Sequence, residues 1–210
     1  MDKQPVRGQE WRSVVGAAVG LGAAGEEGLL AGVRRGEIEA FNTLFLRHYA
    51  TVYGLLYRLV GDEADDLAQE TFWRLYRRPP REPESSVRAW LCRVALNLGY
   101  NALRAARRRS GYEALYHATP EAGAQDAPPG PEAAAQAAEE RRQVRAALAR
   151  LKRRDAQLLT LRYGGASYRE IAETLGVAPG SVGTLLRRAE AAFERAYGAG
   201  ARHGERSRAG

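Results

Sequence analysis

The apolar residues between Ile38 and Leu59 recur at steps of three and four, and this spacing constrains the fold more than any other feature. The positions are Ile38, Phe41, Phe45, Tyr49, Val52, Leu56 and Leu59. Side chains spaced in this way lie on one face of an α-helix, whereas a half-buried strand alternates with a period of two. No segment of the chain shows convincing strand alternation, so the sequence predicts an all-α protein.

Two further helices are expected in the N-terminal half. The first follows Asp62, which can cap it, and ends at Pro79-Pro80, because proline cannot continue a helix. The second follows Ser85 and has a basic C-terminal end, which suits the helix dipole. The apolar stripes are Ala64, Leu67, Thr71 and Leu75 in the first helix, and Val87, Leu91, Val94 and Leu98 in the second; the basic end is Arg104, Arg107, Arg108 and Arg109.

Charge is distributed in blocks along the chain. The 210 residues carry 32 Lys plus Arg against 25 Asp plus Glu, a net charge of +7. Residues 141–197 alone hold twelve basic and five acidic residues, whereas 113–140 hold six acids and neither Lys nor Arg. The acidic stretch also contains the run DAPPGPEAAAQ, which is typical of a linker. We therefore predict two small helical domains joined by a flexible acidic linker.

The expected organisation has five parts. They are a mobile leader (1–25), an N-terminal domain (26–112), the acidic linker (113–140), a C-terminal domain (141–197) and a tail (198–210).

The composition excludes several classes of protein. The single cysteine, Cys92, rules out an intrachain disulfide and the usual cysteine-rich zinc sites, and we expect it to be buried. No run of 18 apolar residues is present, so no membrane insertion is predicted and the cytoplasm is the expected location. Gly20 to Gly25 match the dinucleotide-binding pattern G-x-G-x-x-G, but the βαβ context is missing. The three histidines are scattered, so we predict neither an enzyme nor a cofactor.

The most specific local signal is a helix-turn-helix over residues 167–197. Ser167 and Glu170 form a capping box, Gly176 suits a turn that needs a positive φ, and Pro179 suits the start of a helix. The inward stripe of the second helix is Val182, Leu186, Ala189 and Phe193. This leaves Ser181, Thr184, Arg187 and Arg188 for a major groove and its phosphates. A helical hairpin with a solvated arginine face is the alternative, which the coincidence of signals disfavours.

The order of elements resembles the bacterial RNA polymerase sigma factors of the extracytoplasmic-function (ECF) class. The resemblance covers residues 26–197 and rests on the acidic stretch DEADDLAQETF, the RAWLCRVALNL helix with its basic end, the linker and the helix-turn-helix. It implies that the first domain is region 2 and the second region 4. The implied function is promoter-specific transcription initiation together with core RNA polymerase, by recognition of the -10 and -35 elements of promoter DNA.

The resemblance also implies roles for individual residues. Those expected to contact core polymerase are Asp62, Asp65, Asp66, Gln69 and Glu70. Those expected to bind the -10 element are Trp90, Arg93, Asn97, Asn101 and Arg104, with the 78–86 loop facing a flipped base. Those expected to bind the -35 element are Ser181, Thr184, Arg187 and Arg188. Trp90 taken alone fits core packing and strand separation equally well.

Some features leave alternatives open. Trp90-Leu91 replaces the paired aromatics of housekeeping sigma factors, which implies weaker melting and a stricter promoter. Gly183 and Leu185 stand where many relatives carry basic residues, so base readout from these positions is in doubt. An anti-sigma factor is a candidate partner, and the acidic linker is a candidate mask for the basic C-terminal domain. The alternative function is a conventional helix-turn-helix regulator that binds DNA without polymerase.

Overall fold

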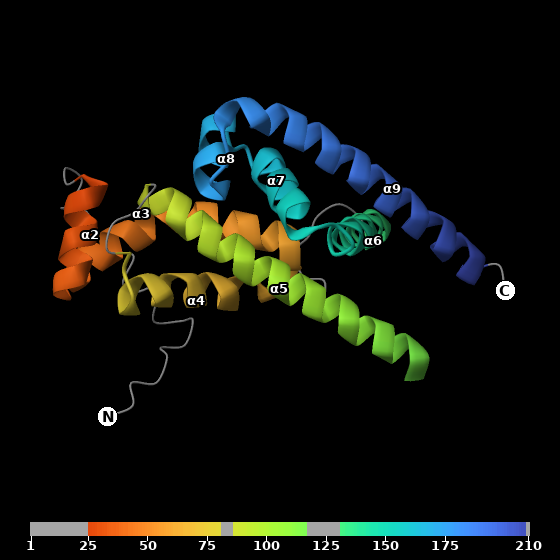
Figure 1. Cartoon of the computed structure of the whole chain (residues 1–210). Coiled ribbons are helices and arrows are strands. Elements are labelled where there is room, and N and C mark those ends of the chain that lie inside the picture. The colour runs from red at the N-terminus through yellow and green to blue at the C-terminus, as the bar shows by residue number, and fades with distance from the viewer. Residues whose placement is uncertain (1–24, 81–85, 117–130, 209–210) are drawn as a thin grey trace.

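A computed structural model shows a wholly helical arrangement in the part of the chain that it describes (Figure 1). The backbone is described for residues 25–80, 86–116 and 131–208. Every regular element in these ranges is an α-helix or a short 3-10 turn, which confirms the predicted all-α class. Residues 1–24 of the predicted leader and residues 117–130, half of the predicted linker, lie outside the described residues.

In the described residues, the N-terminal half consists of α3 and three helices packed around it. They are α2 (Glu26–Arg35), α3 (Ile38–Val60), α4 (Ala64–Arg77) and α5 (Val87–Tyr116), with the 3-10 turn η2 (Gly61–Glu63) before α4. Apart from Ile38, which is exposed, the predicted apolar stripe of α3 faces the other three helices. Leu44 and Leu56 are fully buried in one cluster with Phe72 and Leu91. The three helices expected in this half are confirmed, and α4 ends just before the proline pair.

The structure corrects the expected role of Asp62 as a helix cap. Asp62 lies inside η2, and the residue that precedes α4 is Glu63, whose side chain makes no capping hydrogen bond. Glu63 has helical backbone angles (φ −71°, ψ −1°), whereas a capping side chain needs an extended backbone to reach the next N–H groups. The 3-10 turn therefore replaces side-chain capping at this junction.

The C-terminal half contains α6 (Pro131–Leu148), α7 (Arg153–Tyr163), α8 (Tyr168–Leu175) and α9 (Val182–Arg208), with the 3-10 turn η3 (Pro179–Ser181) before α9. α6 begins inside the segment 113–140, and α9 continues into the segment 198–210. Figure 1 shows α9 as a long helix that runs past α7 and α6 toward the C-terminus.

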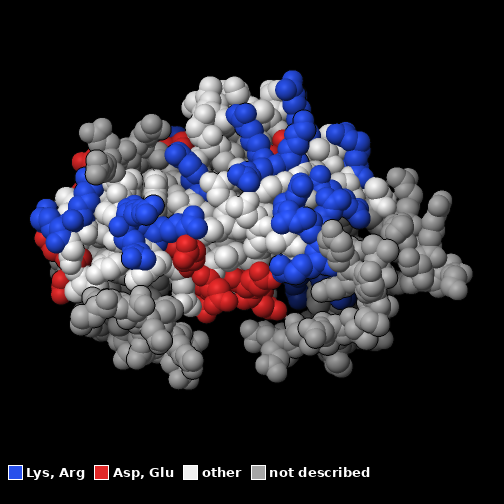
Figure 2. Space-filling view, turned by 60° about the horizontal axis from the view of Figure 1, so that its bottom comes forward, with Lys and Arg blue, Asp and Glu red and all other residues white. Residues whose placement is uncertain are grey.

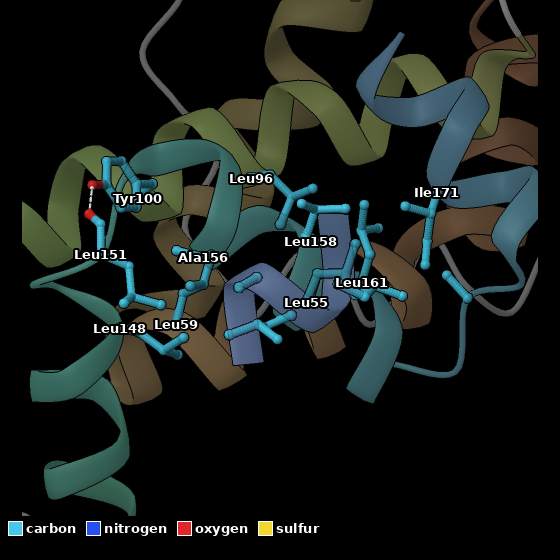
Figure 3. Close-up of a cluster of buried hydrophobic side chains, with 14 of the residues drawn as sticks. Leu55, Leu59, Leu96, Tyr100, Leu148, Leu151, Ala156, Leu158, Leu161 and Ile171 are labelled. Carbon is cyan, nitrogen blue, oxygen red and sulfur yellow. Dashed lines mark hydrogen bonds between the residues drawn. The ribbon is translucent and has the colours of Figure 1, made fainter. Parts of the chain in front are cut away.

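The two halves share one hydrophobic core. Leu55 of α3 and Leu96 of α5 lie in the same buried cluster as Leu158 of α7 and Ile171 of α8. Figure 3 shows these side chains converging from both halves of the chain. Burial of apolar surface is favourable, and this cluster holds α7 against α3 and α5, and α8 against α5.

Candidate nucleic-acid interface

The helix-turn-helix is formed by α8, η3 and α9, and its start is fixed by the expected capping box. The Ser167 hydroxyl accepts a hydrogen bond from the backbone N–H of Glu170 (3.3 Å), and the Ser167 N–H donates to the Glu170 carboxylate (2.8 Å). The backbone N–H of Ser167, and next its hydroxyl, hold the pKa of Glu170 below its usual value, because both donate to the carboxylate. Gly176 ends α8 with φ +64°, the conformation predicted for the turn.

α9 separates a buried face from an exposed one, as the sequence pattern predicts. Val182, Leu186 and Ala189 are almost fully buried, while Phe193 is partly buried against the same core. The four residues expected at the -35 element all carry exposed side chains: Ser181, Thr184, Arg187 and Arg188. The fold therefore brings these four together at the N-terminal part of one helix, where a major groove can be approached.

The two positions whose role in base recognition was in doubt, Gly183 and Leu185, are only partly exposed. Leu185 packs against the hydrophobic core and is partly buried. A side chain at Gly183 would lie 3.6 Å from the Tyr168 ring. Neither residue has a polar side chain. Neither can therefore form a side-chain hydrogen bond with a base edge.

The acidic residues at the start of α4 form a second exposed group. Asp62, Asp65 and Asp66 are exposed, and Gln69 and Glu70 are half-buried one turn further along. The opposite face of α4 is seated on the core through Ala64, Ala68 and Phe72. Figure 2 shows a compact acidic group on this side of the molecule, with basic side chains on either side of it.

Two neighbours orient carboxylates within this acidic group. The Tyr49 hydroxyl donates to Asp65 (2.6 Å), and the Arg74 guanidinium donates to Glu70 (2.7 Å). Asp62 and Asp66 remain exposed beside them. Such a surface repels the phosphates of DNA and suits a basic or mixed protein surface.

The residues expected at the -10 element lie on α5, and three of them are engaged by the C-terminal half. Arg93 donates to the Thr174 carbonyl (2.8 Å) and the Glu173 carbonyl (3.1 Å) at the end of α8. The Asn97 side-chain carbonyl accepts from Gln157 (2.9 Å), and that of Asn101 accepts from Arg153 (2.9 Å). Arg104 is exposed, and its guanidinium lies 3.5 Å from the Tyr100 hydroxyl.

Trp90 lies apart from these contacts, beside the C-terminal end of α4. It is partly buried and packs against the N-terminal core. It also lines a cavity of about 750 Å³ with Trp73, Arg77 and Arg78. The position of Trp90 is therefore compatible both with packing in the core and with a role in strand separation.

Trp73 and Arg77 were missed as candidates from the sequence. The Trp73 side chain is 39% exposed, and the Arg77 guanidinium carbon lies 5.4 Å from the centre of its ring. Their spacing of four residues on a predicted helix, close to a proline pair, is the signal that would have placed them together.

The described residues form neither a metal site nor an exposed reactive thiol. No group of three or more His, Cys, Asp or Glu side chains there could hold a metal ion. Cys92 is buried as expected, and burial raises the pKa of its thiol to about 11. Among the described helices, none is both long and apolar enough to cross a bilayer.

Comparison with known families gives two matches in chain order. The model of Sigma-70 region 2 matches residues 44–109, and that of Sigma-70, region 4 matches residues 141–193. Both the acidic group of α4 and the expected -10 residues fall in the first match, and residues 167–193 of the helix-turn-helix fall in the second.

Curated relatives and solved structures agree with these matches. The chain is 34% identical over 152 residues to the ECF RNA polymerase sigma factor SigE of Mycolicibacterium smegmatis, covering 71% of this chain and 58% of the relative. It is 38% identical over 87 residues to the RNA polymerase sigma-H factor of Pseudomonas aeruginosa, covering 40% of this chain and 45% of the relative. The chain thus spans about half the length of the curated relatives it matches. The structure of CnrH in complex with the cytosolic domain of CnrY has a similar fold, with 22% identity and a TM-score of 0.52, over 83% of this chain and 97% of that one.

Proposed function

The chain belongs to the sigma-70 family, with ECF sigma factors among its relatives, and on that premise we propose that it is an alternative sigma factor. In this role it binds core RNA polymerase and directs initiation at promoters that carry matched -10 and -35 elements. It contributes binding and positioning, and the polymerase performs the chemistry. The site of action is the cytoplasm, where the polymerase meets its template.

The observation that carries the proposal is the presence of both modules in one chain. Region 2 over residues 44–109 precedes region 4 over residues 141–193 in this chain. A conventional regulator needs the helix-turn-helix but not an exposed acidic helix face in a separate module. The two modules together fit a protein that must hold a large protein partner and DNA at once.

Three surfaces divide the work in this proposal. The acidic group at the start of α4 contacts the polymerase, since acidic and amide side chains suit a protein surface and repel DNA. The exposed end of α9 contacts the -35 duplex, with Arg187 and Arg188 on phosphates. The α5 residues Trp90, Arg93, Asn97, Asn101 and Arg104 take the -10 element, where an aromatic, amides and cations serve stacking, base edges and phosphates.

A further partner is suggested by a structural neighbour. CnrH, a structural neighbour, is solved in complex with the cytosolic domain of CnrY, and we propose a comparable anti-sigma partner for this chain. The domain limits at 26–112, 113–140 and 141–197 are proposed as the working units of the protein.

The experiment that tests the function is run-off transcription with purified core RNA polymerase on genomic DNA fragments. Discrete transcripts that appear only when the full chain is added are expected. Footprints from the protein alone, without polymerase binding, would identify a conventional helix-turn-helix regulator and would remove the roles given to α4 and α5.

A separate variant tests whether the acidic group at the start of α4 contacts the polymerase. Asp66→Arg should reduce assembly with core polymerase in a pull-down while the protein still binds -35 duplex DNA, because the change reverses a charge far from α9. Glu194→Arg is the matched control, since it makes the same charge change on an exposed residue of α9. Equal assembly by the Asp66→Arg variant and the unmodified protein would show that this face is not the contact.

A further inference from the structure

A cavity of about 840 Å³ lies where the end of α3 meets α6, α7 and α9. Its exposed lining is mostly apolar, and the larger apolar and aromatic side chains in it are Tyr57, Val144, Leu148, Leu159, Tyr163 and Phe193. Leu148 and Leu159 are buried, whereas Tyr57 and Tyr163 keep much of their surface exposed. A cavity of this volume, with aromatic walls, is typical of a site for a small organic molecule.

Two hydrogen bonds hold α9 against α6 and the turn that follows it. The Arg150 guanidinium donates to the Ala196 carbonyl (3.0 Å), and the Tyr197 hydroxyl donates to the side-chain oxygen of Gln143 (3.3 Å). The Tyr197 ring also stacks on Phe193, which lines the cavity (ring centres 5.7 Å apart). The aromatic wall is therefore in place before a ligand arrives, and this lowers the ordering cost of binding.

Arg145 of α6 brings a positive charge into the lining of this cavity. Its side chain is half-buried, and its guanidinium lies over Gly61, where a Cβ atom would be 3.4 Å from one guanidinium nitrogen. Burial lowers the pKa of Arg145, while the nearby Tyr57 hydroxyl acts in the opposite direction. Among the described residues, no carboxylate or carbonyl accepts a hydrogen bond from this guanidinium. A partly desolvated cation without an acceptor favours an anion beside it.

The other charged groups of the lining restrict which anion can bind. They are Arg58, Arg141, Glu140, Glu190 and Glu194. Glu140 and Glu194 are exposed, so they lie toward solvent, whereas Arg145 is half-buried. A polyanion such as nucleic acid would place several charges against these glutamates and would be repelled. A molecule with a single anionic group can reach Arg145 without that cost.

We propose that this cavity is a binding site for a small organic anion with an aromatic body. The anionic group pairs with the Arg145 guanidinium, and the aromatic body packs against Tyr57, Tyr163 and Phe193. The ligand contacts α3 as well as α6, α7 and α9, so its binding stabilises the arrangement seen in the structure. This site is independent of the proposed function, because it involves neither promoter DNA nor the acidic group of α4.

The test is a fluorescence titration of the full chain with anilinonaphthalene sulfonate, an aromatic anion. Phenylnaphthylamine has the same ring system without the sulfonate and is the neutral probe. We expect one saturable sulfonate site, and Arg145→Gln should weaken sulfonate binding by about tenfold while it leaves the neutral probe within about twofold. Arg154→Gln removes the same charge from an exposed residue of α7 outside the cavity and should leave both affinities within about twofold.

Two further variants separate the anion contact from the aromatic wall. Arg145→Lys keeps the charge and should retain most of the sulfonate affinity. Tyr163→Ala removes an exposed ring, so it should weaken both probes by roughly threefold or more, since this contact does not depend on charge. The melting temperature of the unmodified chain should rise with sulfonate concentration, because the folded chain alone holds the site.

Equal sulfonate affinity in the Arg145→Gln variant and the Arg154→Gln control would overturn the proposal, and so would the lack of a saturable site. The same variants are compared in a pull-down with core polymerase. Loss of assembly by Arg145→Gln together with unchanged sulfonate affinity would assign the cavity to a polymerase contact instead. Run-off transcription by the same preparation tests the proposed function separately, because transcription can succeed while the sulfonate fails to bind.

Discussion

The hydroxyl of Tyr100 offers a measurable test of how firmly the two modules are joined. It donates to the backbone carbonyl of Leu151 at 2.6 Å, and both residues are 5% exposed. Figure 3 shows this bond at one end of the shared core, between α5 and the segment before α7. Tyr100→Phe removes one oxygen atom and keeps the ring, so the surrounding packing is preserved.

The expected magnitude follows from the burial. A buried carbonyl that loses its donor keeps its desolvation cost, so Tyr100→Phe should lower the free energy of unfolding by about 1–2 kcal/mol. For a chain of this size each kcal/mol shifts the melting temperature by roughly 2–4 °C. A loss of this size lowers the ratio of folded to unfolded protein by a factor of roughly 5–30.

The assay is urea unfolding followed by circular dichroism, with thermal melting as a second measurement. Tyr163→Phe is the matched control, because it removes the same atom from a side chain that is 69% exposed on α7. That variant should stay within about 0.5 kcal/mol of the unmodified protein. Equal unfolding free energies for the two variants would refute the reasoning and would mean that the modules are not held at Tyr100.

Three further outcomes are expected. Ser167→Ala should cost about 1 kcal/mol of unfolding free energy in urea, because it removes the cap of α8, whereas Ser167→Asp should retain most of it. Glu170 has a pKa lowered mainly by the Ser167 N–H, so its contribution to stability is complete above the ordinary glutamate pKa and is lost as the pH falls through the lowered value; acid titration of Glu170→Gln should lack this component. Arg187→Ala combined with Arg188→Ala should weaken -35 duplex binding across sequences and reduce its salt slope, whereas sequence-selective loss would make these residues base readers.

Local structure was predictable where one residue type has a special conformational role. Ser167 and Glu170 satisfy the N–H groups at a helix start whatever packs around them, and Gly176 takes a positive φ at low cost. The α3 stripe was predictable because its period alone fixes which face is buried. The expected cap at Asp62 was wrong because the 3-10 turn η2 gives the residue before α4 helical backbone angles in place of extended ones. A pattern of residue types does not report such a turn.

The packing between the modules was beyond the sequence pattern for a different reason. The predicted stripes place Leu91 and Leu186 on the inward faces of their helices, but periodicity does not say which helix each one meets. The acidic linker separates the two helices in sequence, so a shared core and two separate cores predict the same stripes. The same holds for Asn97, whose amide suits a DNA base and the side chain of Gln157 equally well.

The three proposed surfaces differ in exposure, and this difference sets an order of events. Asp62, Asp65 and Asp66 are exposed in the structure, in which α8 packs on α5. Arg187 and Arg188 are exposed as well. Arg93 of α5 donates to two backbone carbonyls of α8. Polymerase and the -35 duplex can therefore bind while α8 packs on α5. The -10 strand can reach Arg93 only when α8 moves away from α5. A partner that binds more tightly when α8 is separated from α5 provides the free energy for this separation, since a ligand shifts an equilibrium only by its preference for one state.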